Sequence, residues 1–319
     1  MMNVRRWNMV KAFAPATVTN VSCGFDIMGF ALQEPGDTVI LRPNGTSTLR
    51  ITEIHPSHLS LPHAIEENTA GKAILAMQRA LGISVGLDIA IYKQLGIGTG
   101  LGSSAASAAA AVVAFNHLLP SPLPQKALLP FAIEGEAISS GRTVHIDNVA
   151  ASLLGGFIVI RNINPPDVLN IPYPKELYCA VIHPHIELKT ADMRAILHQH
   201  IPLSQAVEQW GNIAGLIIGL MQEDYSLISR SLKDVIVEPI RSQVIPGFDA
   251  ARQAAMAAGA LGCGISGSGP SLFALAANHT IAQQCGKAMQ TTYLNLGINS
   301  DLYISPINSH GAKVIAAEN

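Results

Sequence analysis

The chain has 319 residues, of which 49% are hydrophobic and 13% charged, and its formal net charge is -2. This composition supports large buried cores, enough for two ordinary domains, and excludes a disordered chain. No run of basic residues is present, which argues against nucleic acid as a partner. No apolar run is long enough to span a membrane, and no sustained apolar stretch precedes Pro15, so we expect neither a membrane anchor nor a signal peptide.

The first half of the chain predicts alternating strands and helices. The strand-like pieces are Val39–Arg42, Leu49–Glu53 and Val85–Tyr92. The helices are a segment from Asn68 or Thr69, as the N-cap, to Leu81, with Gly82 as its stop, then about Ser103–Leu118 and roughly Pro124–Ser139.

The second half predicts a further α/β series. Gly155–Arg161 reads as a strand, and the proline- and asparagine-rich Asn162–Pro174 reads as a loop near a domain boundary. The elements expected after it are, in order, a strand at Tyr178–Ile182, helices within Ser204–Leu232, a helix at Phe248–Ala258, a strand at Ser271–Ala276, a helix at Ile281–Leu294 and a strand at Asp301–Ile304. The last four alternate as in a split βαβ sandwich, so the fold class is α+β with two domains.

The cysteines and histidines suggest no disulfide and no metal. The four cysteines are scattered without a CxxC pair, which fits reduced thiols in the cytoplasm: Cys23, Cys179, Cys263 and Cys285. The histidines occur in two pairs that no third ligand joins at a useful spacing, so we expect surface or loop positions for them: His183 with His185 and His198 with His200.

The stretch GIGTGLGSSAASAAAAVV, Gly96 to Val113, is an uncharged glycine-rich loop that enters an alanine-rich helix. It matches neither a Walker A loop, since no lysine follows the glycines, nor the GxGxxG dinucleotide fingerprint. Glycines still let the backbone approach a ligand, and the following helix offers free N–H groups to an anion. We therefore expect a nucleotide phosphate with Mg²⁺ here, assisted by Ser103 and Ser104. The alternative is an ordinary turn before a buried helix.

A second glycine-rich stretch, GCGISGSGP from Gly262 to Pro270, does contain GxGxxG. A helix precedes it and a strand follows, whereas the dinucleotide fingerprint requires a strand, then the loop, then a helix. Two interpretations stay open from the residues alone, a second loop that packs near the first and a tight helix-to-strand turn.

Three stretches together resemble the GHMP kinase family: Pro15–Gly29, Gly96–Ser107 and Gly262–Ala274. The linking segments Glu134–Ala150, Lys189–Arg194 and Asp234–Arg241 are similar to the branch of that family that phosphorylates homoserine. Two positions depart from the family pattern, which usually has proline where Gly96 and Ala151 stand, and neither change removes a chemical group.

The resemblance implies a two-domain fold. Residues 1–165 would form a domain like the second domain of ribosomal protein S5, with the phosphate loop, and residues 166–319 a ferredoxin-like domain. It also implies ATP-dependent phosphorylation of the side-chain hydroxyl of L-homoserine to O-phospho-L-homoserine, a step of threonine biosynthesis, in a cytoplasmic enzyme, and a homodimer.

The resemblance also assigns roles to residues at the amino-acid end. Asn20 and Asp26 would hold the ammonium of homoserine. Arg194 and Arg241, with Thr190, would grip its carboxylate, since a guanidinium fork suits that group. His145 and Asn148 would line the pocket, with Asn148 bonded to the alcohol. Each residue taken singly has another interpretation. Asp26 is also typical of a turn residue, each arginine is typical of a solvated surface charge, and His145 is typical of a histidine in the core.

At the nucleotide end the resemblance assigns Asn68 to adenosine, and Ser104 and Glu136 to Mg²⁺. Residues that would wrap the phosphates are Gly96, Ile97, Gly98, Thr99, Gly100, Leu101, Gly102, Ser103, Ser104 and Ala105. The residues expected to carry catalysis are Asn148, Glu136 and Ser104. We expect no dedicated general base, because phosphoryl transfer has a loose transition state and the alcohol proton can pass to the γ-phosphate. Asp147 then serves as a helix cap rather than a base.

Two other functions stay open. A kinase of the same fold could act on another small alcohol such as mevalonate, for which Asp26 would be idle. A non-catalytic sensor of amino acids or nucleotides is the second, although the pairing of Ser104 with Glu136 argues against it, since a sensor needs no magnesium site.

Overall fold

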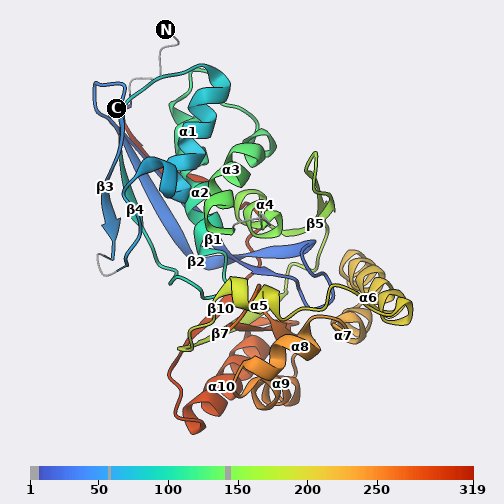
Figure 1. The fold of residues 1–319 in the computed structure, drawn as a ribbon. Helices are drawn as coiled ribbons and strands as arrows, with labels where there is room; N and C mark the ends of the chain where they lie inside the picture. Colours follow the sequence, from blue (N-terminus) through green and yellow to red (C-terminus); the bar gives the residue numbers. More distant parts are fainter. Residues whose placement is uncertain (1–6, 57–58, 141–144) are drawn as a thin grey trace.

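The computed structural model describes residues 7–56, 59–140 and 145–319. Residues 141–144, part of the stretch Glu134–Ala150 discussed above, lie outside the described residues. The chain forms two layered units, one above the other in Figure 1, with the N-terminal half mainly in the upper unit.

The upper unit contains a seven-stranded sheet in the order β11-β1-β2-β4-β3, with β5 beside β2 and β6 beside β5. Neighbouring strands run antiparallel except β3 and β4, which are parallel. The strands are β1 (Met9–Thr19), β2 (Met28–Pro43), β3 (Leu49–His55), β4 (Leu87–Tyr92), β5 (Phe157–Asn162), β6 (Asp167–Ile171) and β11 (Lys313–Glu318).

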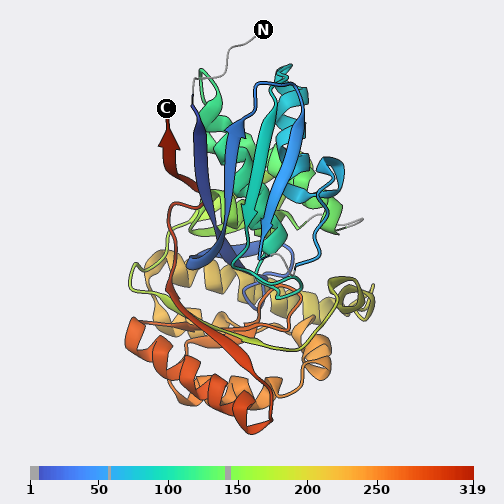
Figure 2. The ribbon, with the colours of Figure 1, turned by 90° about the vertical axis from the view of Figure 1, so that its left-hand side faces the viewer.

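Helices cover one face of this sheet, and Figure 2 shows its strands with the helices behind them. They are α1 (Thr69–Leu81), α2 (Ser103–Leu118), α3 (Leu129–Ser140) and α4 (Ile146–Leu154), with short 3-10 turns η1 (Ile65–Glu67) and η2 (Gln125–Leu128). The alanines of α2 are buried, because their small side chains allow the helix to pack closely on the sheet and on α1 and α3.

The lower unit is a four-stranded antiparallel sheet in the order β10-β7-β9-β8. Its strands are β7 (Tyr178–Pro184), β8 (Gly262–Ile265), β9 (Leu272–Ala276) and β10 (Ser300–Pro306). Its helices are α5 (Thr190–Ala195), α6 (Leu203–Gln222), α7 (Tyr225–Ser231), α8 (Glu238–Arg241), α9 (Phe248–Ala257) and α10 (His279–Asn295), with the 3-10 turn η3 (Ser242–Val244). The α+β class with two domains is confirmed.

The sheets divide the chain differently from the expected boundary between residues 165 and 166. That boundary falls inside the hairpin of β5 and β6, which pair antiparallel. The proposed loop Asn162–Pro174 therefore contains a strand, the edge strand β6, and its prolines lie just outside that strand on either side. The end of the chain also returns to the first sheet, where β11 pairs with β1.

Local signals placed several helix ends correctly. The side chain of Asn68 accepts hydrogen bonds from the N–H groups of Ala70 and Gly71, and Gly82 closes α1 in the left-handed conformation with φ 63°. The predicted helix Ser103–Leu118 has the bounds of α2. The four cysteines are free and buried. Within the described residues, no helix combines the length and apolarity needed to cross a membrane.

Candidate active site

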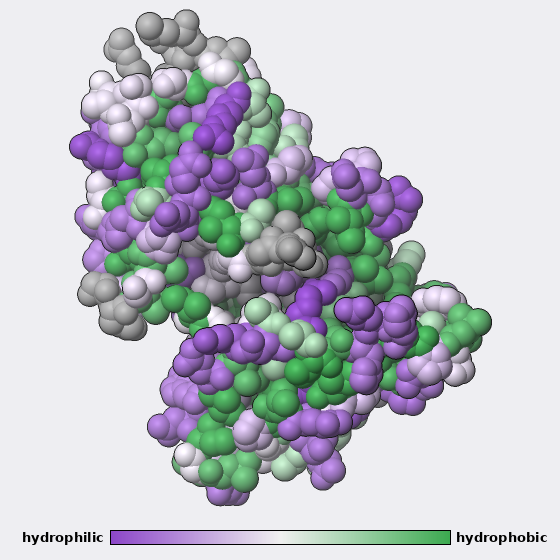
Figure 3. Space-filling view, viewed as in Figure 1, coloured by the Kyte–Doolittle hydropathy of each residue, from purple (hydrophilic) through white to green (hydrophobic). Residues whose placement is uncertain are grey.

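A cleft of about 540 Å³ lies between the two units. In Figure 3 the outline of the molecule narrows between the two units. The walls of the cleft come from the loop before α2, the N-terminal ends of α4 and α5, the turn between β1 and β2, and the loop after β8. Residues far apart in the sequence thus meet around one cavity.

The glycine loop, Gly96–Gly102, has an alternating backbone. Gly98, Gly100 and Gly102 have positive φ angles of 72°, 75° and 69°, whereas the residues between them, Thr99 and Leu101, do not have positive φ angles. Alternation of left- and right-handed residues turns successive N–H groups toward one side, which makes a concave site for an anion. Because Gly102 is also the N-cap of α2, the free N–H groups and partial positive charge of that helix end add to the same site.

The second glycine loop, Ser266–Gly269, packs directly on the first. Ser266 Oγ donates to the carbonyl of Gly100 at 2.8 Å. A Cβ on Gly100 would lie 2.5 Å from the carbonyl oxygen of Ser266, and one on Gly267 would lie 2.9 Å from that of Gly100. The interpretation as two adjacent loops is therefore confirmed, although Gly262–Ile265 forms β8 rather than loop.

A buried lysine supports the glycine loop from below. Lys93 forms an ion pair with Asp37, and its Nζ donates to the carbonyl of Ser103 at 2.8 Å and to Ser107 Oγ at 2.9 Å. The side chains of Lys93 and Asp37 are 4% and 0% exposed. Sequence reasoning missed this cluster, since it searched for a lysine after the glycines. Asp37 lies within β2 and Lys93 directly after β4, 56 residues apart in the sequence, so no local pattern pairs them.

The left-handed loop, Asn20–Asp26, carries two predicted site residues. Asn20, Val21, Ser22 and Asp26 have φ values of 70°, 41°, 57° and 58°. Such backbone costs a non-glycine residue roughly 1–3 kcal/mol and persists only where its surroundings enforce it. Asn20 is fixed at both ends of its amide, since Nδ2 donates to the carbonyl of Gly267 at 2.7 Å and Oδ1 accepts from the N–H of Asp26 at 3.0 Å.

Asp26 and Arg194 form an ion pair across the cleft. Arg194 Nη2 lies 2.8 and 2.9 Å from the two carboxylate oxygens of Asp26, and both side chains are one-third exposed. Asp26, the predicted partner of the substrate ammonium, and Arg194, the predicted partner of the substrate carboxylate, thus neutralise each other in this structure. A zwitterionic ligand could replace this contact with one salt bridge to each side chain.

Arg241 is buried behind this pair. It donates to the carbonyls of Met193 at 3.2 Å and Gly267 at 2.9 Å. Burial, with Arg194 nearby, lowers its pKa to about 10, so it stays charged at neutral pH. The guanidinium carbons of Arg194 and Arg241 both lie 5.2 Å from the ring centroid of Phe25. Sequence reasoning did not select Phe25, whose contact with both arginines only the fold creates.

A cluster of titratable groups lies at the start of α4. His145 Nδ1 is 3.4 Å from Glu136 Oε1, and this hydrogen bond raises the pKa of His145. Asp147 is 3% exposed, and burial, together with the charge of Asp26, raises its pKa to about 6. Asp147 Oδ1 accepts from the N–H of Asn148 at 2.9 Å. Asp147 is not the N-cap of α4, since His145 holds that position and no side chain caps the helix; Asp147 is an acidic residue of the first turn.

Asn148 is tied to the first strand. Its Oδ1 accepts from Thr17 Oγ1 at 2.8 Å and its Nδ2 donates to Thr19 Oγ1 at 3.2 Å. A Cβ on Gly102 would lie 2.7 Å from Asn148 Oδ1, so this side chain also contacts the base of the glycine loop. Asn148 therefore sits where the strand, the loop and the cleft meet.

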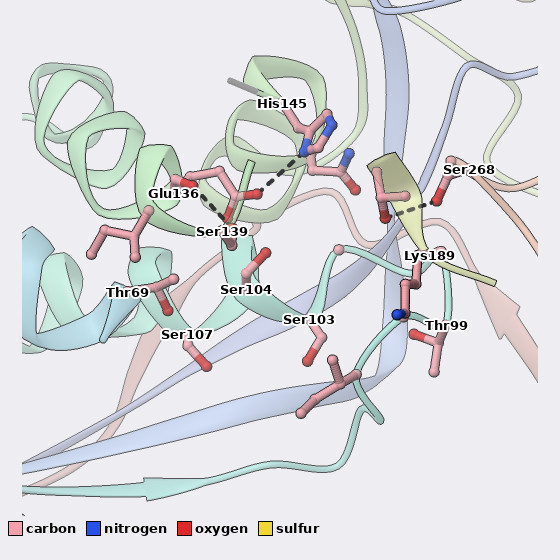
Figure 4. Close-up of a pocket in the computed structure, with 18 of the residues that line it drawn as sticks. Thr69, Thr99, Ser103, Ser104, Ser107, Glu136, Ser139, His145, Lys189 and Ser268 are labelled. Carbon is pink, nitrogen blue, oxygen red and sulfur yellow. Dashed lines mark hydrogen bonds and ion pairs between the residues drawn. The ribbon is translucent and has the colours of Figure 1, made fainter. Parts of the chain in front are cut away.

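Glu136 and Ser104 offer a carboxylate and a hydroxyl to the same cleft, and Figure 4 shows both side chains there. Magnesium binds through few protein oxygens, and water and phosphate oxygens supply the rest. This donor set fits that chemistry. Among the described residues, no group of three or more His, Cys, Asp or Glu side chains forms a metal cage of its own.

Most predicted site residues line the cleft, and a few do not. Those that line it are Asn20, Asp26, Asn68, Ile97, Gly98, Thr99, Gly100, Gly102, Ser103, Ser104, Glu136, His145, Asn148, Thr190, Arg194 and Arg241. Leu101 and Ala105 are buried beneath the loop, because an apolar side chain there anchors the loop to the core. Gly96 is exposed, and it is not among the residues that line the cleft.

Lys189 is a lining residue that the prediction did not select. It is exposed and stands directly before α5, with its side chain pointing into the cleft in Figure 4. The segment is seated against the glycine loop, since a Cβ on Gly98 would lie 3.6 Å from the carbonyl oxygen of Leu188. Next to it, Thr190 Oγ1 lies 3.2 Å from Ser268 Oγ.

Comparison with known proteins gives consistent matches. The N-terminal domain model of GHMP kinases matches residues 68–156 and the C-terminal model matches residues 216–295. The chain is 46% identical to the homoserine kinase of Chlorobium phaeobacteroides (strain BS1), covering 96% of this chain and 99% of that protein. It is similar to the crystal structure of homoserine kinase from Cytophaga hutchinsonii, with a TM-score of 0.95, 50% identity and 98% of each chain covered.

Proposed function

The chain belongs to the GHMP kinase family, among the homoserine kinases, and we propose that it transfers the γ-phosphoryl group of ATP to the side-chain hydroxyl of L-homoserine. The observation that carries the proposal is that a backbone anion site and an Asp–Arg amino-acid site line one cleft. The product, O-phospho-L-homoserine, is the one that a threonine biosynthetic route requires. The cytoplasmic location and the homodimer remain predictions.

At the nucleotide end, the N–H groups of the glycine loop and the start of α2 would bind the phosphates of ATP. Fixed dipoles are effective there because they need no reorganisation as charge moves during the reaction. Asn68 is among the residues that line the cleft, and its assignment to the adenosine is carried by the family resemblance. Mg²⁺, held by Ser104 and Glu136, would neutralise phosphate charge.

A triphosphate also requires cations, and among the described residues that line the cleft one cation, Lys189, forms no ion pair. Of the lysines and arginines that line it, Lys93 pairs with Asp37, Arg194 pairs with Asp26, and Arg241 donates to two carbonyls. No ion pair of Lys189 occurs within the part of the chain that the structure describes. We therefore assign Lys189 to the terminal phosphate, which the glycine loop itself leaves without a charged protein partner.

At the amino-acid end, homoserine would open the Asp26–Arg194 pair. Its ammonium would bind Asp26 beside Asn20, and its carboxylate would bind Arg194 and Arg241 with Thr190. Both charges of the protein then regain a partner, so the exchange costs little electrostatic energy. The substrate would lie with its hydroxyl toward Asn148 and the glycine loop.

Positioning rather than proton abstraction would drive the reaction. Asp147 is buried and bonded to Asn148, and its carboxylate already accepts from the helix backbone. The alcohol proton would pass to the transferred phosphoryl group, as the loose transition state allows. His145, charged in part because of Glu136, would add positive potential near the reacting groups.

The test is ATP consumption with a panel of alcohols containing homoserine, mevalonate, galactose and shikimate. We expect turnover with homoserine well above the rest. Preference for mevalonate would instead support the other kinase function. Nucleotide binding without turnover of any alcohol would support a sensor.

A further inference from the structure

The left-handed loop needs support, because its residues hold a backbone shape that they do not prefer. Asn20, Val21 and Ser22 are consecutive, and valine is branched at Cβ, which makes positive φ least tolerable. The loop closes on itself through a hydrogen bond from the N–H of Gly24 to the carbonyl of Asn20 at 2.7 Å. Within this turn the carbonyl of Cys23 remains available to a donor from elsewhere in the fold.

Gln209 on α6 supplies that donor from the other unit. Its Nε2 lies 2.8 Å from the carbonyl oxygen of Cys23 and 3.0 Å from Asp234 Oδ1, and its Oε1 accepts from the N–H of Val235 at 3.0 Å. The side chain is 5% exposed. A buried amide with both ends bonded is rigid, because breaking any of these bonds leaves a polar atom without water.

Asp234 extends the connection to α8. Its carboxylate accepts from the N–H groups of Ile236, Val237 and Glu238 at 2.9, 3.1 and 2.8 Å. These bonds fix the start of the helix that carries Arg241 at its other end. Gln209 therefore hydrogen-bonds to two parts of the site. One bond reaches the Asn20–Asp26 loop, and the other reaches Asp234, which fixes the start of the helix that carries Arg241.

We propose that Gln209 is a positioning residue for the amino-acid end of the site. It aligns the Asn20–Asp26 loop with Arg241 through the Cys23 carbonyl and the Asp234 carboxylate, and it contacts no ligand. The proposal rests on the proposed function for the identity of the substrate. It predicts that loss of this amide impairs homoserine binding and leaves the nucleotide end intact.

The test is Gln209→Met, which keeps the length of the side chain and removes its hydrogen bonds. We expect KM for homoserine to rise about tenfold while KM for ATP changes less than twofold. A purely structural role would lower Tm and the active fraction without moving KM. Gln209→Glu is the second variant, since it keeps the acceptor for Val235 and loses the donor to Cys23, and we expect the same rise.

The matched control is Asn212→Leu on the same helix. Asn212 Nδ2 donates to the carbonyl of Lys233 at 3.0 Å, so it makes the same type of bond to the segment before α8 but does not reach the left-handed loop. We expect both KM values of this control to equal those of the unmodified chain. A matching homoserine KM shift in the control would overturn the proposal.

Hydrogen exchange gives a readout that does not depend on turnover. The amides of Gly24, Ile27 and Met28 are bonded within the loop, and we expect them to exchange at least tenfold faster in Gln209→Met but not in Asn212→Leu. Unchanged exchange, unchanged KM for homoserine, or failure of both Gln209 variants to fold would each overturn the positioning role. If the unmodified chain phosphorylates no homoserine, the proposed function fails instead, and exchange still decides whether Gln209 holds the loop.

Discussion

The two ends of the cleft are built in different ways. The phosphate-binding part of the nucleotide end is one continuous glycine-rich segment that offers backbone N–H groups, with a lysine–aspartate pair buried beneath it. The amino-acid end gathers charged side chains from the left-handed loop, α5 and α8. Function of the nucleotide end should therefore be impaired by atoms added to its backbone, and function of the amino-acid end by removal of a charged side chain. The variants below test this contrast.

The largest effect is expected at the nucleotide end from Gly100→Ala. The new Cβ would lie 2.5 and 2.9 Å from the carbonyl oxygens of Ser266 and Gly269, at a φ of +75°. Either the two glycine loops separate or the chain loses about 2–4 kcal/mol of stability, and ATP-dependent turnover should fall more than a hundredfold. Turnover and Tm measure this.

Gly45→Ala is the control for this variant. Gly45 has a φ of +71° with nothing within 4 Å of the added Cβ. It should show the cost of left-handed backbone alone, about 1–2 kcal/mol, with kinetics unchanged. Equal kinetics of Gly100→Ala and the unmodified chain would mean that close packing of the two loops is not needed.

The next effect is at the amino-acid end. Arg194→Ala removes a charged donor and leaves Asp26 without its partner, so homoserine binding should weaken by about 1.5–3 kcal/mol, seen as KM. KM for ATP should stay the same. Arg161→Ala, which breaks a surface pair with Asp167, is the control. An unchanged KM for homoserine would remove Arg194 from the carboxylate site.

A smaller effect is expected from Lys189→Met, which removes the cation assigned to the terminal phosphate. KM for ATP should rise roughly tenfold, the lower part of the range for a hydrogen bond to a charged group, with KM for homoserine little changed. Lys189→Arg should retain most of the affinity. Lys287→Met, at an exposed position of α10, is the control. If Lys189→Met and Lys287→Met behave alike, Lys189 is an ordinary surface charge.

The smallest effect on turnover is expected from Asp147→Asn, since no general base is proposed. The pKa of Asp147 is raised from 3.8 to about 6. The folded chain therefore keeps a proton that the unfolded chain releases between these values, so stability falls as pH rises through this window. Asn avoids burying the charge, so the variant should gain roughly 2–4 °C in Tm at pH 8 and less at pH 4.5.

The kinetic part of this prediction is that kcat stays within about tenfold of the unmodified chain, the size of a modest change in positioning. A fall of several hundredfold with normal homoserine binding and normal folding would show that Asp147 accepts the alcohol proton. Such a fall would also mean that a side chain, rather than backbone groups, makes the main contribution to phosphoryl transfer where the two ends of the cleft meet.

Local sequence determined the parts of this protein whose physics is local. The bounds of α2, the Asn68 cap and Gly82 stop of α1, and the anion-binding character of the glycine loop follow from glycine, alanine and capping residues within a few positions of each other. Resemblance of motifs added the family and most of the residues that line the cleft.

Tertiary structure decided what depends on distant contacts. Only the fold shows that β6 and β11 join the first sheet, that Lys93 is buried on Asp37, and that Gln209 reaches the Cys23 carbonyl. The physical reason is that edge pairing, buried ion pairs and support of a strained loop all depend on partners far away in the chain. No pattern of neighbouring residues records those partners.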